Sequence, residues 1–408
     1  MIHPESFQHS PALTRSHRDW QPEQLAMAAQ ITAGFADRNA NLFRGLSIPL
    51  GDPAAWIRIP SRGDVEARSI AIVRDLEMDR VRGVADVDVV HCPADFENHA
   101  RSFSSDRETA VMQSLAACLL DHDIKVVRAD RSLPLIAIVQ LIEAGVDVVY
   151  DEELGVTDRR VKSDDEQDRL RHAQRVTEEV MKQVCEYIAS ATANADGVLH
   201  HDGQAISSES VRSIAAVEFL ARGFSMTHGA IIAGPPHAGD CHHAGTGSLH
   251  TGVPIIVDLF PRDDTSRYHG DCTRTVVHGD VPDVIAEMHA AVVEAKKAAE
   301  AVLIPGRTAE SVHHAARDVL IRSGYTENRG TITNEPSIQH GLGHGIGLEI
   351  HEPILLDDGG GEILPGEVFT IEPGLYGRDT GGVRVEDMLV ATDAGGLNFN
   401  CLPTGLTW

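Results

Sequence analysis

Between residues 69 and 152, short apolar runs rich in β-branched residues alternate with longer segments of helical periodicity. The pattern predicts strands at SIAIV, VDVVHC, IKVVRAD and VDVVYDE, and helices at RETAVMQSLAACLLDH and PLIAIVQLIEAG. This alternation is typical of a parallel sheet with crossover helices, so we expect an α/β domain in the first third of the chain. The segment contains no glycine-rich phosphate loop, and we therefore expect no nucleotide site there.

The rest of the chain has a different order of elements. A charged segment, residues 155–174, leads into a helix that we expect to run through Ala189, with Ser163 or Asp164 as its N-cap. The pattern then predicts a helix at SSESVRSIAAVEFLARG, a strand pair at THGAIIAG and VPIIVDLF, helices at VPDVIAEMHAAVVEAKKAAEAVL and RTAESVHHAARDVLIRSG, and strands at EVFTIEPGLY and GGVRVEDMLVAT. Helices beside an antiparallel sheet indicate an α+β domain. We place the boundary near residue 160, with domains at 1–160 and 161–408.

Composition and charge limit the classes of partner. Hydrophobic residues make up 42% and charged residues 24% of the 408 residues, which is ordinary for a folded globular protein. The 35 basic and 61 acidic residues leave a net charge of −26. A negative field repels phosphate backbones and anionic lipids, so we expect neither nucleic acid nor membranes as partners. Solubility is the simplest explanation of the acidity itself.

Cysteine usage and the terminus bear on the compartment. The six cysteines form no C-x-x-C pair, which argues against a disulfide scaffold and a thiolate zinc site. The initial segment MIHPESFQHSPALTR lacks an export signal, and polar residues interrupt the most apolar stretch, residues 133–150. We expect a cytoplasmic protein.

The candidate chemistry lies in carboxylates that interrupt apolar runs of the second domain: Asp258, Asp271, Glu372 and Glu386. A carboxylate in a buried strand has to be paired, protonated or bound to a metal. Each of them alone is more simply an ordinary salt bridge or a residue at a strand edge. Four in one domain indicate a shared cation.

A fifth candidate ligand, His344, lies in the glycine-rich segment HGLGHGIGLEIHEP, where glycines let the backbone pass close to a site. One imidazole and four carboxylates form an oxygen-rich set that suits Mn(II), Co(II) or Fe(II) and tolerates Zn(II). Four negative ligands balance two divalent ions. We therefore expect a dinuclear centre, with Mn(II) as the first choice of metal.

The motifs DLFPRDDTSRYHGDCTRT, HGLGHGIGLEIHEP, FTIEPGLY and GGVRVED resemble those of the pita-bread metallopeptidases, which include methionine aminopeptidase, Xaa-Pro aminopeptidase, prolidase and the metal-free creatinase. The resemblance covers about residues 160–408. It implies an α+β pita-bread catalytic domain preceded by a smaller, creatinase-like α/β N-terminal domain. It assigns the metals to Asp258, Asp271, His344, Glu372 and Glu386. Asp271 and Glu386 resemble the bridging carboxylates.

The same resemblance implies further site residues. His242 and His351 resemble histidines that contact substrate, with His243 as the alternative to His242, and Arg384 resembles an arginine that steadies the carboxylates. The segment FPRDDTSRY stands where the family commonly has a short turn, so we expect the ligands to be kept and the rim of the site to differ. The N-terminal domain disfavours the short methionine aminopeptidases, and the full ligand set disfavours creatinase.

The implied reaction is hydrolysis of a peptide bond by a metal-bridged hydroxide, with Glu372 carrying the proton and His351 or His242 donating to the oxyanion. The first expectation is an Xaa-Pro aminopeptidase or dipeptidase acting on short peptides. A hydrolase or lyase acting on a small amide or osmolyte is the second, and a non-catalytic binding module the third. We also expect a homodimer in which residues 1–160 limit the length of the substrate.

Overall fold

The computed structural model describes residue 25, residues 27–61 and residues 66–408. The initial segment MIHPESFQHSPALTR lies outside the described residues. The chain splits into two compact units, Met1–Asp158 and Arg159–Trp408, and each has hydrophobic clusters of its own.

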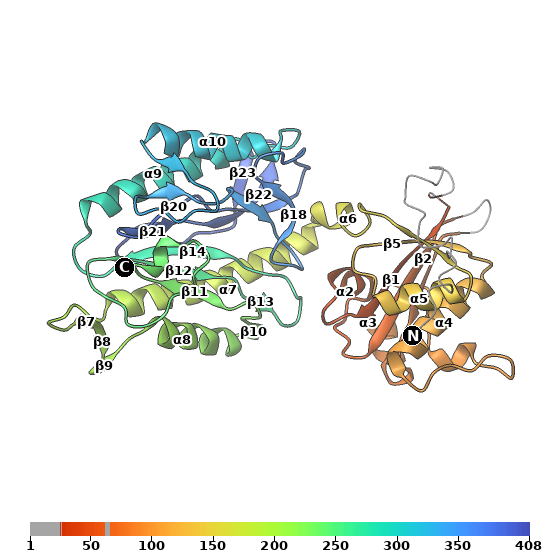
Figure 1. Ribbon diagram of the computed structural model, residues 1–408. Coiled ribbons are helices and arrows are strands. Elements are labelled where there is room, and N and C mark those ends of the chain that lie inside the picture. Colours follow the sequence, from red (N-terminus) through yellow and green to blue (C-terminus); the bar gives the residue numbers. More distant parts are fainter. Residues whose placement is uncertain (1–24, 26, 62–65) are drawn as a thin grey trace, which may run out of the picture. The chain divides into compact units, whose positions relative to one another are not determined.

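A six-stranded sheet in the order β4-β3-β2-β1-β5-β6 forms the first unit (Figure 1). Its strands are β1 (Ala29–Phe35), β2 (Pro53–Ile59), β3 (Arg68–Ile72), β4 (Val89–His91), β5 (Val126–Ala129) and β6 (Asp147–Tyr150). The four predicted strands are β3 to β6, and they pair in parallel as β3–β4 and β5–β6. The expectation of a parallel sheet is wrong in the middle, because β2 pairs antiparallel with both β1 and β3. The connection from β2 to β3 is too short to hold a crossover helix.

Helices of the first unit surround this sheet. They are α2 (Ala40–Leu46), α3 (Met78–Val84), α4 (Arg107–Asp121) and α5 (Leu135–Glu143), with short 3₁₀ turns at Asp75–Glu77 and Pro93–Phe96. The single turn α6 (Thr157–Arg160) spans the boundary between the two units. The predicted helices α4 and α5 are confirmed. Asp106 caps α4 by accepting from the Thr109 amide at 2.9 Å, which satisfies one of the free amides of the first turn.

The helices of the second unit are α7 (Asp164–Ala189), α8 (Ser208–Leu220), α9 (Asp283–Glu300) and α10 (Ala309–Arg322). All four are confirmed, and α7 ends at Ala189 as predicted. Its N-cap is Ser163 rather than Asp164. Ser163 Oγ accepts from the Glu166 amide at 3.3 Å, and the Glu166 carboxylate accepts from the Ser163 amide at 2.9 Å. No helix in the described part of the chain is long and apolar enough to cross a bilayer.

Three sheets shape the core of the second unit. One contains β11 (Ala230–Ala233), β12 (Pro254–Leu259) and β14 (Cys272–Val277); the next contains β15 (Thr326–Glu327), β16 (Ser337–Ile338), β20 (Gly374–Gly377) and β21 (Gly381–Arg384); the third contains β17 (Gly343–Gly345), β18 (Glu352–Leu356), β19 (Val368–Ile371), β22 (Asp387–Thr392) and β23 (Gly395–Asn398). Smaller sheets contain β7 (Thr192–Ala193), β8 (Leu199–His201) and β9 (Gln204–Ala205), and β10 (Phe224–Ser225) with β13 (Arg262–Asp263). The pairing is antiparallel apart from β15–β16, which confirms the expected α+β arrangement.

The strands around the carboxylates are not continuous. The predicted strand EVFTIEPGLY is divided into β19 and β20 with Glu372 at the break, and GGVRVEDMLVAT is divided into β21 and β22 with Glu386 at the break. Asp271 immediately precedes β14, so only Asp258, in β12, lies within one of these strands. The expectation of carboxylates inside buried strands is therefore wrong for three of the four. All four carboxylates nevertheless line one cavity.

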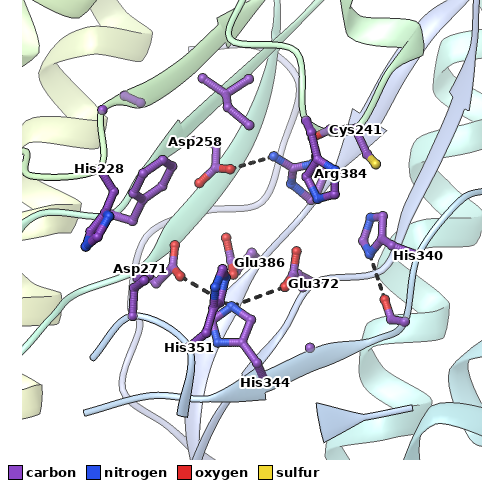
Figure 2. A pocket seen from close by; sticks show the side chains of 18 of the residues that line it. His228, Cys241, Asp258, Asp271, His340, His344, His351, Glu372, Arg384 and Glu386 are labelled. Carbon is purple, nitrogen blue, oxygen red and sulfur yellow. Dashed lines mark hydrogen bonds and ion pairs between the residues drawn. The ribbon is translucent and has the colours of Figure 1, made fainter. Parts of the chain in front are cut away.

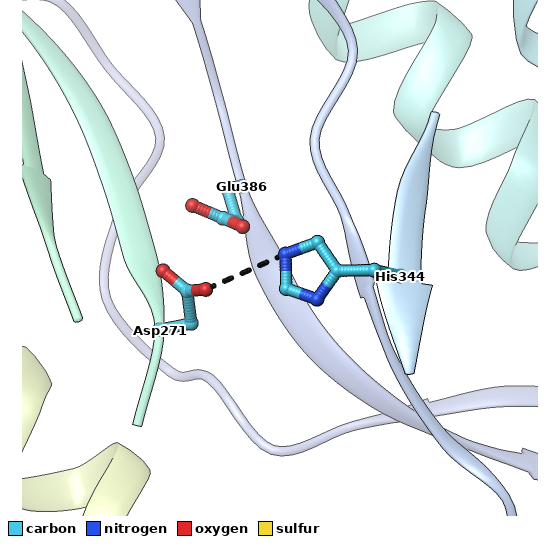
Figure 3. A group of neighbouring side chains, drawn as sticks. All are labelled: Asp271, His344 and Glu386. Atoms are coloured by element: carbon cyan, nitrogen blue, oxygen red, sulfur yellow. Dashed lines mark ion pairs between the residues drawn. The ribbon is translucent and has the colours of Figure 1, made fainter. Parts of the chain in front are cut away.

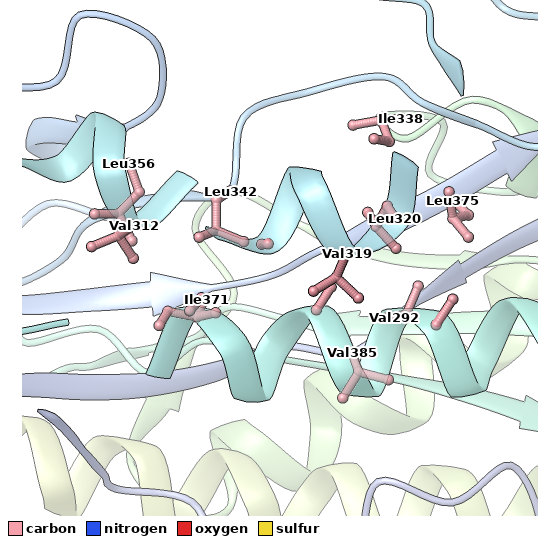
Figure 4. Packing of buried hydrophobic residues seen from close by; sticks show 14 of the residues in the cluster. Val292, Val312, Val319, Leu320, Ile338, Leu342, Leu356, Ile371, Leu375 and Val385 are labelled. Carbon is pink, nitrogen blue, oxygen red and sulfur yellow. The ribbon is translucent and has the colours of Figure 1, made fainter. Parts of the chain in front are cut away.

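Helices α9 and α10 pack with these strands in one hydrophobic cluster (Figure 4). Ile371 and Val385 are fully buried in this cluster, and each immediately precedes a carboxylate of the site in the sequence. Removing a buried aliphatic side chain of this size typically costs about 2 to 5 kcal/mol. The hydrophobic core thus fixes the backbone next to Glu372, between β19 and β20, and next to Glu386, between β21 and β22.

Candidate metal centre

A cavity of about 870 Å³ lies within the second unit, a size ordinary for a small-molecule site. Its lining includes every residue that the sequence analysis assigned to metal or substrate: His242, Asp258, Asp271, His344, His351, Glu372, Arg384 and Glu386. All of these except His242 are labelled in Figure 2. The alternative His243 is not part of the lining. Its Nδ1 accepts from the Gly245 amide at 3.0 Å, and its ring stacks on that of His237.

Asp271, His344 and Glu386 each offer a ligand atom, and these atoms lie within 4.8 Å of one another (Figure 3). His344 Nε2 is 3.8 Å from Asp271 Oδ2 and 3.5 Å from Glu372 Oε1. His344 Nδ1 lies 3.1 Å from the Gly345 carbonyl, which can only accept, so Nδ1 carries the proton. Nε2 is left with a lone pair that faces the carboxylates, the arrangement of a metal-binding histidine.

Asp258 has a different environment. Its Oδ2 accepts from Arg384 Nη2 at 2.5 Å, whereas its buried Oδ1 has no hydrogen-bond partner among the described residues. A buried anionic oxygen without a partner is costly and calls for a ligand that the protein itself does not supply. Asp258 therefore stands outside the three-residue cluster but presents one open oxygen to the same cavity.

The pKa values of the site reflect its burial and its concentration of carboxylates. Burial raises the pKa of Asp271 and of Glu386 well above the ordinary value, and repulsion from the neighbouring carboxylates adds to it. Burial also raises the pKa of Glu372 to about 7, whereas burial and the nearby His351 lower the pKa of His344 to about 3. A neutral imidazole among carboxylates that resist ionisation fits a site for divalent cations, because such ions stabilise the ionised carboxylates.

This electrostatic state predicts an unusual pH dependence for the metal-free protein. A carboxyl whose pKa rises from 4.5 to about 7 on folding stabilises the fold below about 4.5, and that stabilisation is lost as the pH rises through about 7. Between about pH 5 and pH 8, metal-free wild type should lose roughly 3 kcal/mol of unfolding free energy relative to metal-free Glu372→Gln. Urea unfolding of both proteins at several pH values measures the difference, and parallel curves would contradict the shift.

Residues that the sequence analysis missed hold the ligands in place. Gln174, on α7, accepts from the Asp271 amide at 2.8 Å and donates to the Asp271 carbonyl at 2.6 Å. Thr273 Oγ1 donates to Glu386 Oε2 at 2.6 Å and accepts from Arg384 Nε at 3.2 Å. Two features of the sequence could have identified these residues. Gln174 is a polar residue on the apolar face of a helix, and Thr273 is a hydroxyl residue two positions after the proposed ligand Asp271.

A second set of contacts supports Arg384. Its Nη1 donates to Tyr376 Oη at 2.9 Å, and Tyr376 Oη lies 2.7 Å from His340 Nε2. His340 Nδ1 is 2.7 Å from the Gly341 carbonyl and must be the donor there, so Nε2 accepts from the tyrosine hydroxyl. Burial lowers the pKa of His340 to about 3, with Arg384 contributing. His340 is therefore a neutral support for Tyr376 and Arg384.

The cavity wall also contains residues outside the ligand set. The His351 ring packs edge-on against His344 with centroids 4.3 Å apart, and the unpredicted His228 lines the cavity just before β11. The segment between Asp258 and Asp271 is held by pairing of β13 with β10, and its Phe260 reaches the lining. Both aspartates at its ends line the cavity. The segment thus contributes an apolar side chain to the site.

Comparison with known proteins gives consistent matches. The model of metallopeptidase family M24 matches residues 168–393. The probable dipeptidase PepE of Mycobacterium tuberculosis is 32% identical over 247 residues, which are 60% of this chain and 60% of that protein. The solved Xaa-Pro dipeptidase from Bacillus anthracis has a TM-score of 0.76 at 20% identity, covering 94% of this chain and 96% of that chain. The prolidase from Pyrococcus horikoshii has a TM-score of 0.73 at 21% identity, with the same coverage of 94% and 96%. The expected fold, a pita-bread domain preceded by a smaller α/β domain, is confirmed.

Proposed function

The chain belongs to metallopeptidase family M24, and we propose from this membership and from the cavity that it hydrolyses short peptides with proline after the scissile bond. The observation that carries the proposal is the convergence of Asp271, His344 and Glu386, beside Glu372, in one buried cavity. The names of similar proteins, Xaa-Pro dipeptidase and prolidase, suggest the preference for proline.

Two divalent cations would be held by Asp258, Asp271, His344, Glu372 and Glu386, which line the same cavity. When bound, such ions supply Lewis acidity that polarises a carbonyl and makes water nucleophilic near neutral pH. The oxygen-rich donor set favours Mn(II), with Co(II), Fe(II) and Zn(II) as alternatives.

The side chains of the cavity have separate roles in proton transfer, oxyanion stabilisation and positioning of the carboxylates. Glu372 accepts a proton from the attacking water and donates it to the leaving nitrogen, a role for which a carboxylate beside the reacting atoms is suited. His351 and His242 line the cavity on its exposed side and can donate to the oxyanion of the tetrahedral intermediate. Arg384 neutralises Asp258 and holds its carboxylate in one orientation.

Assembly and compartment form the remaining part of the proposal. Prolidase-like resemblance favours a homodimer, in which residues 1–160 limit substrate length. A mass of twice 44.1 kDa by light scattering is the expected result. All six cysteines are free and five are buried, which suits a reducing cytoplasm.

The decisive experiment is an assay of metal-loaded protein against matched peptides. Xaa-Pro dipeptides and Xaa-Pro-Xaa tripeptides are compared with the same peptides carrying alanine in place of proline. Cleavage of the dipeptides alone indicates a dipeptidase, and cleavage of the tripeptides at the first bond indicates an aminopeptidase. Cleavage of small non-peptide amides without peptide cleavage would overturn the proposal in favour of a different hydrolase.

A further inference from the structure

The hairpin between β17 and β18 carries two histidines of the site. His344 lies in β17, and His351 is the last residue of the loop 346–351 before β18 begins at Glu352. The His351 ring packs edge-on against His344 but is otherwise exposed to solvent, so this one ring contact does little to fix it. Its position therefore depends on what holds the loop.

The Glu352 side chain turns back under this loop. Its Oε1 accepts from the amides of Leu348 at 3.1 Å and Glu349 at 3.3 Å. Gly347 permits this approach, because a Cβ there would lie 2.7 Å from Glu352 Oε2. The buried Glu352 carboxylate thus holds two backbone amides of the loop that ends at His351.

A cation from a distant part of the chain holds Glu352. Lys162 Nζ donates to Glu352 Oε2 at 2.8 Å and to the Arg159 carbonyl at 2.6 Å. The Lys162 side chain is 3% exposed and that of Glu352 is 2% exposed, so solvent does not screen the pair. Arg159 adds an ion pair to Glu349 on the same loop. The loop is therefore fastened to residues 159–162, where the second unit begins.

We propose that Lys162, through Glu352, is a positioning residue for His351. The ion pair fixes the loop amides, the loop fixes the imidazole at the cavity, and catalysis depends on the placement of that imidazole. The role of His351 rests on the proposed function, whereas the fastening of the loop is a property of the fold. A misplacement of about 1 Å can cost on the order of 10²-fold in rate.

The same segment offers a matched control. Arg160 pairs with Glu367, whose side chain is also 2% exposed and accepts from the Leu364 amide at 2.6 Å. The Arg160 side chain is 15% exposed against 3% for Lys162, so this pair is also largely buried, and it does not touch the loop 346–351. Lys162→Met and Arg160→Met therefore both remove a cation from a buried ion pair. Only Lys162→Met removes a contact that holds the loop 346–351.

The experiment compares full-length wild type, Lys162→Met, Arg160→Met and the double variant Lys162→Met/Glu352→Gln. Lys162→Met should lower kcat by roughly 10- to 100-fold with little change in KM, and hydrogen exchange should become faster in peptides covering the loop 346–351. Arg160→Met should keep kcat within about threefold of wild type and leave exchange in that loop unchanged. Lys162→Met leaves the Glu352 carboxylate with the longer ion pair to Arg159, whose Nη1 lies 3.5 Å from Glu352 Oε1. The double variant removes this poorly compensated charge while keeping an acceptor for the loop amides, so its kcat should recover to within about tenfold of wild type.

Three results would overturn the inference. They are equal losses of kcat in Lys162→Met and Arg160→Met, unchanged exchange of the loop in Lys162→Met, and no recovery of kcat in the double variant. If Lys162→Met does not fold, hydrogen exchange of the double variant decides, because this variant also lacks the ion pair, and a wild-type exchange rate in the loop 346–351 would overturn the inference. If wild type cleaves no Xaa-Pro peptide, the proposed function fails, and the exchange comparison alone still decides whether Lys162 fastens the loop.

Discussion

Replacing His344 or Glu372 with alanine is expected to reduce turnover of an Xaa-Pro dipeptide by roughly 10²- to 10⁴-fold. His344 Nε2 faces both Asp271 and Glu372, so its loss removes the one neutral nitrogen donor of the cluster. Loss of Glu372 removes both a metal ligand and the proposed proton carrier. Steady-state kinetics of metal-loaded variants, with metal content measured on the same samples, tests the expectation.

His340→Ala provides the comparison within the same glycine-rich segment. His340 contacts Tyr376 rather than the carboxylates, so its loss loosens Tyr376 and Arg384 but leaves the ligand cluster complete. We expect a decrease of about tenfold in turnover, at the lower end of what outer contacts of a metal site contribute. Equal losses at His340, His344 and Glu372 would mean that the proposed ligand assignment is too narrow.

Removal of the metal is expected to abolish hydrolysis and to lower the melting temperature. Without cations, burial and repulsion from neighbouring carboxylates raise the pKa of Asp271 and of Glu386, so ionising them is costly. A ligand at a hundred times its dissociation constant stabilises the folded state by about 2.7 kcal/mol, so chelation should shift the unfolding curve visibly. Calorimetry with and without chelator, followed by titration with Mn(II), measures both effects.

The stoichiometry of that titration tests the dinuclear centre. The open Oδ1 of Asp258 supports a second cation beside the cluster of three, so two equivalents should restore activity. Asp258→Asn should then bind a single equivalent and keep little activity. Full activity in protein shown to be free of metal by elemental analysis would exclude the proposed chemistry.

Much of the fold and of the candidate site could be predicted from local patterns. Several carboxylates that interrupt apolar runs in one domain indicate a shared site, and this signal identified Asp258 and Glu372 as residues that line the cavity. Helix ends are equally local, because the Ser163–Glu166 capping box and the end of α7 at Ala189 depend on neighbouring residues. Hydrophobic periodicity and helix caps depend on residues close in sequence, so they can be predicted from the sequence alone.

The identity of the contacting partners was decided by the tertiary structure. Asp258 meets Arg384 across 126 positions, and Lys162 meets Glu352 across 190 positions. Neither pair has a local signature, because any basic residue could have served until packing brought one within reach. The antiparallel pairing of β2 with β1 and β3 likewise exists only in the folded sheet. The sequence therefore predicts which side chains belong to the candidate site. The packing of distant segments determines which neighbours hold those side chains, since such contacts exist only once the chain has folded.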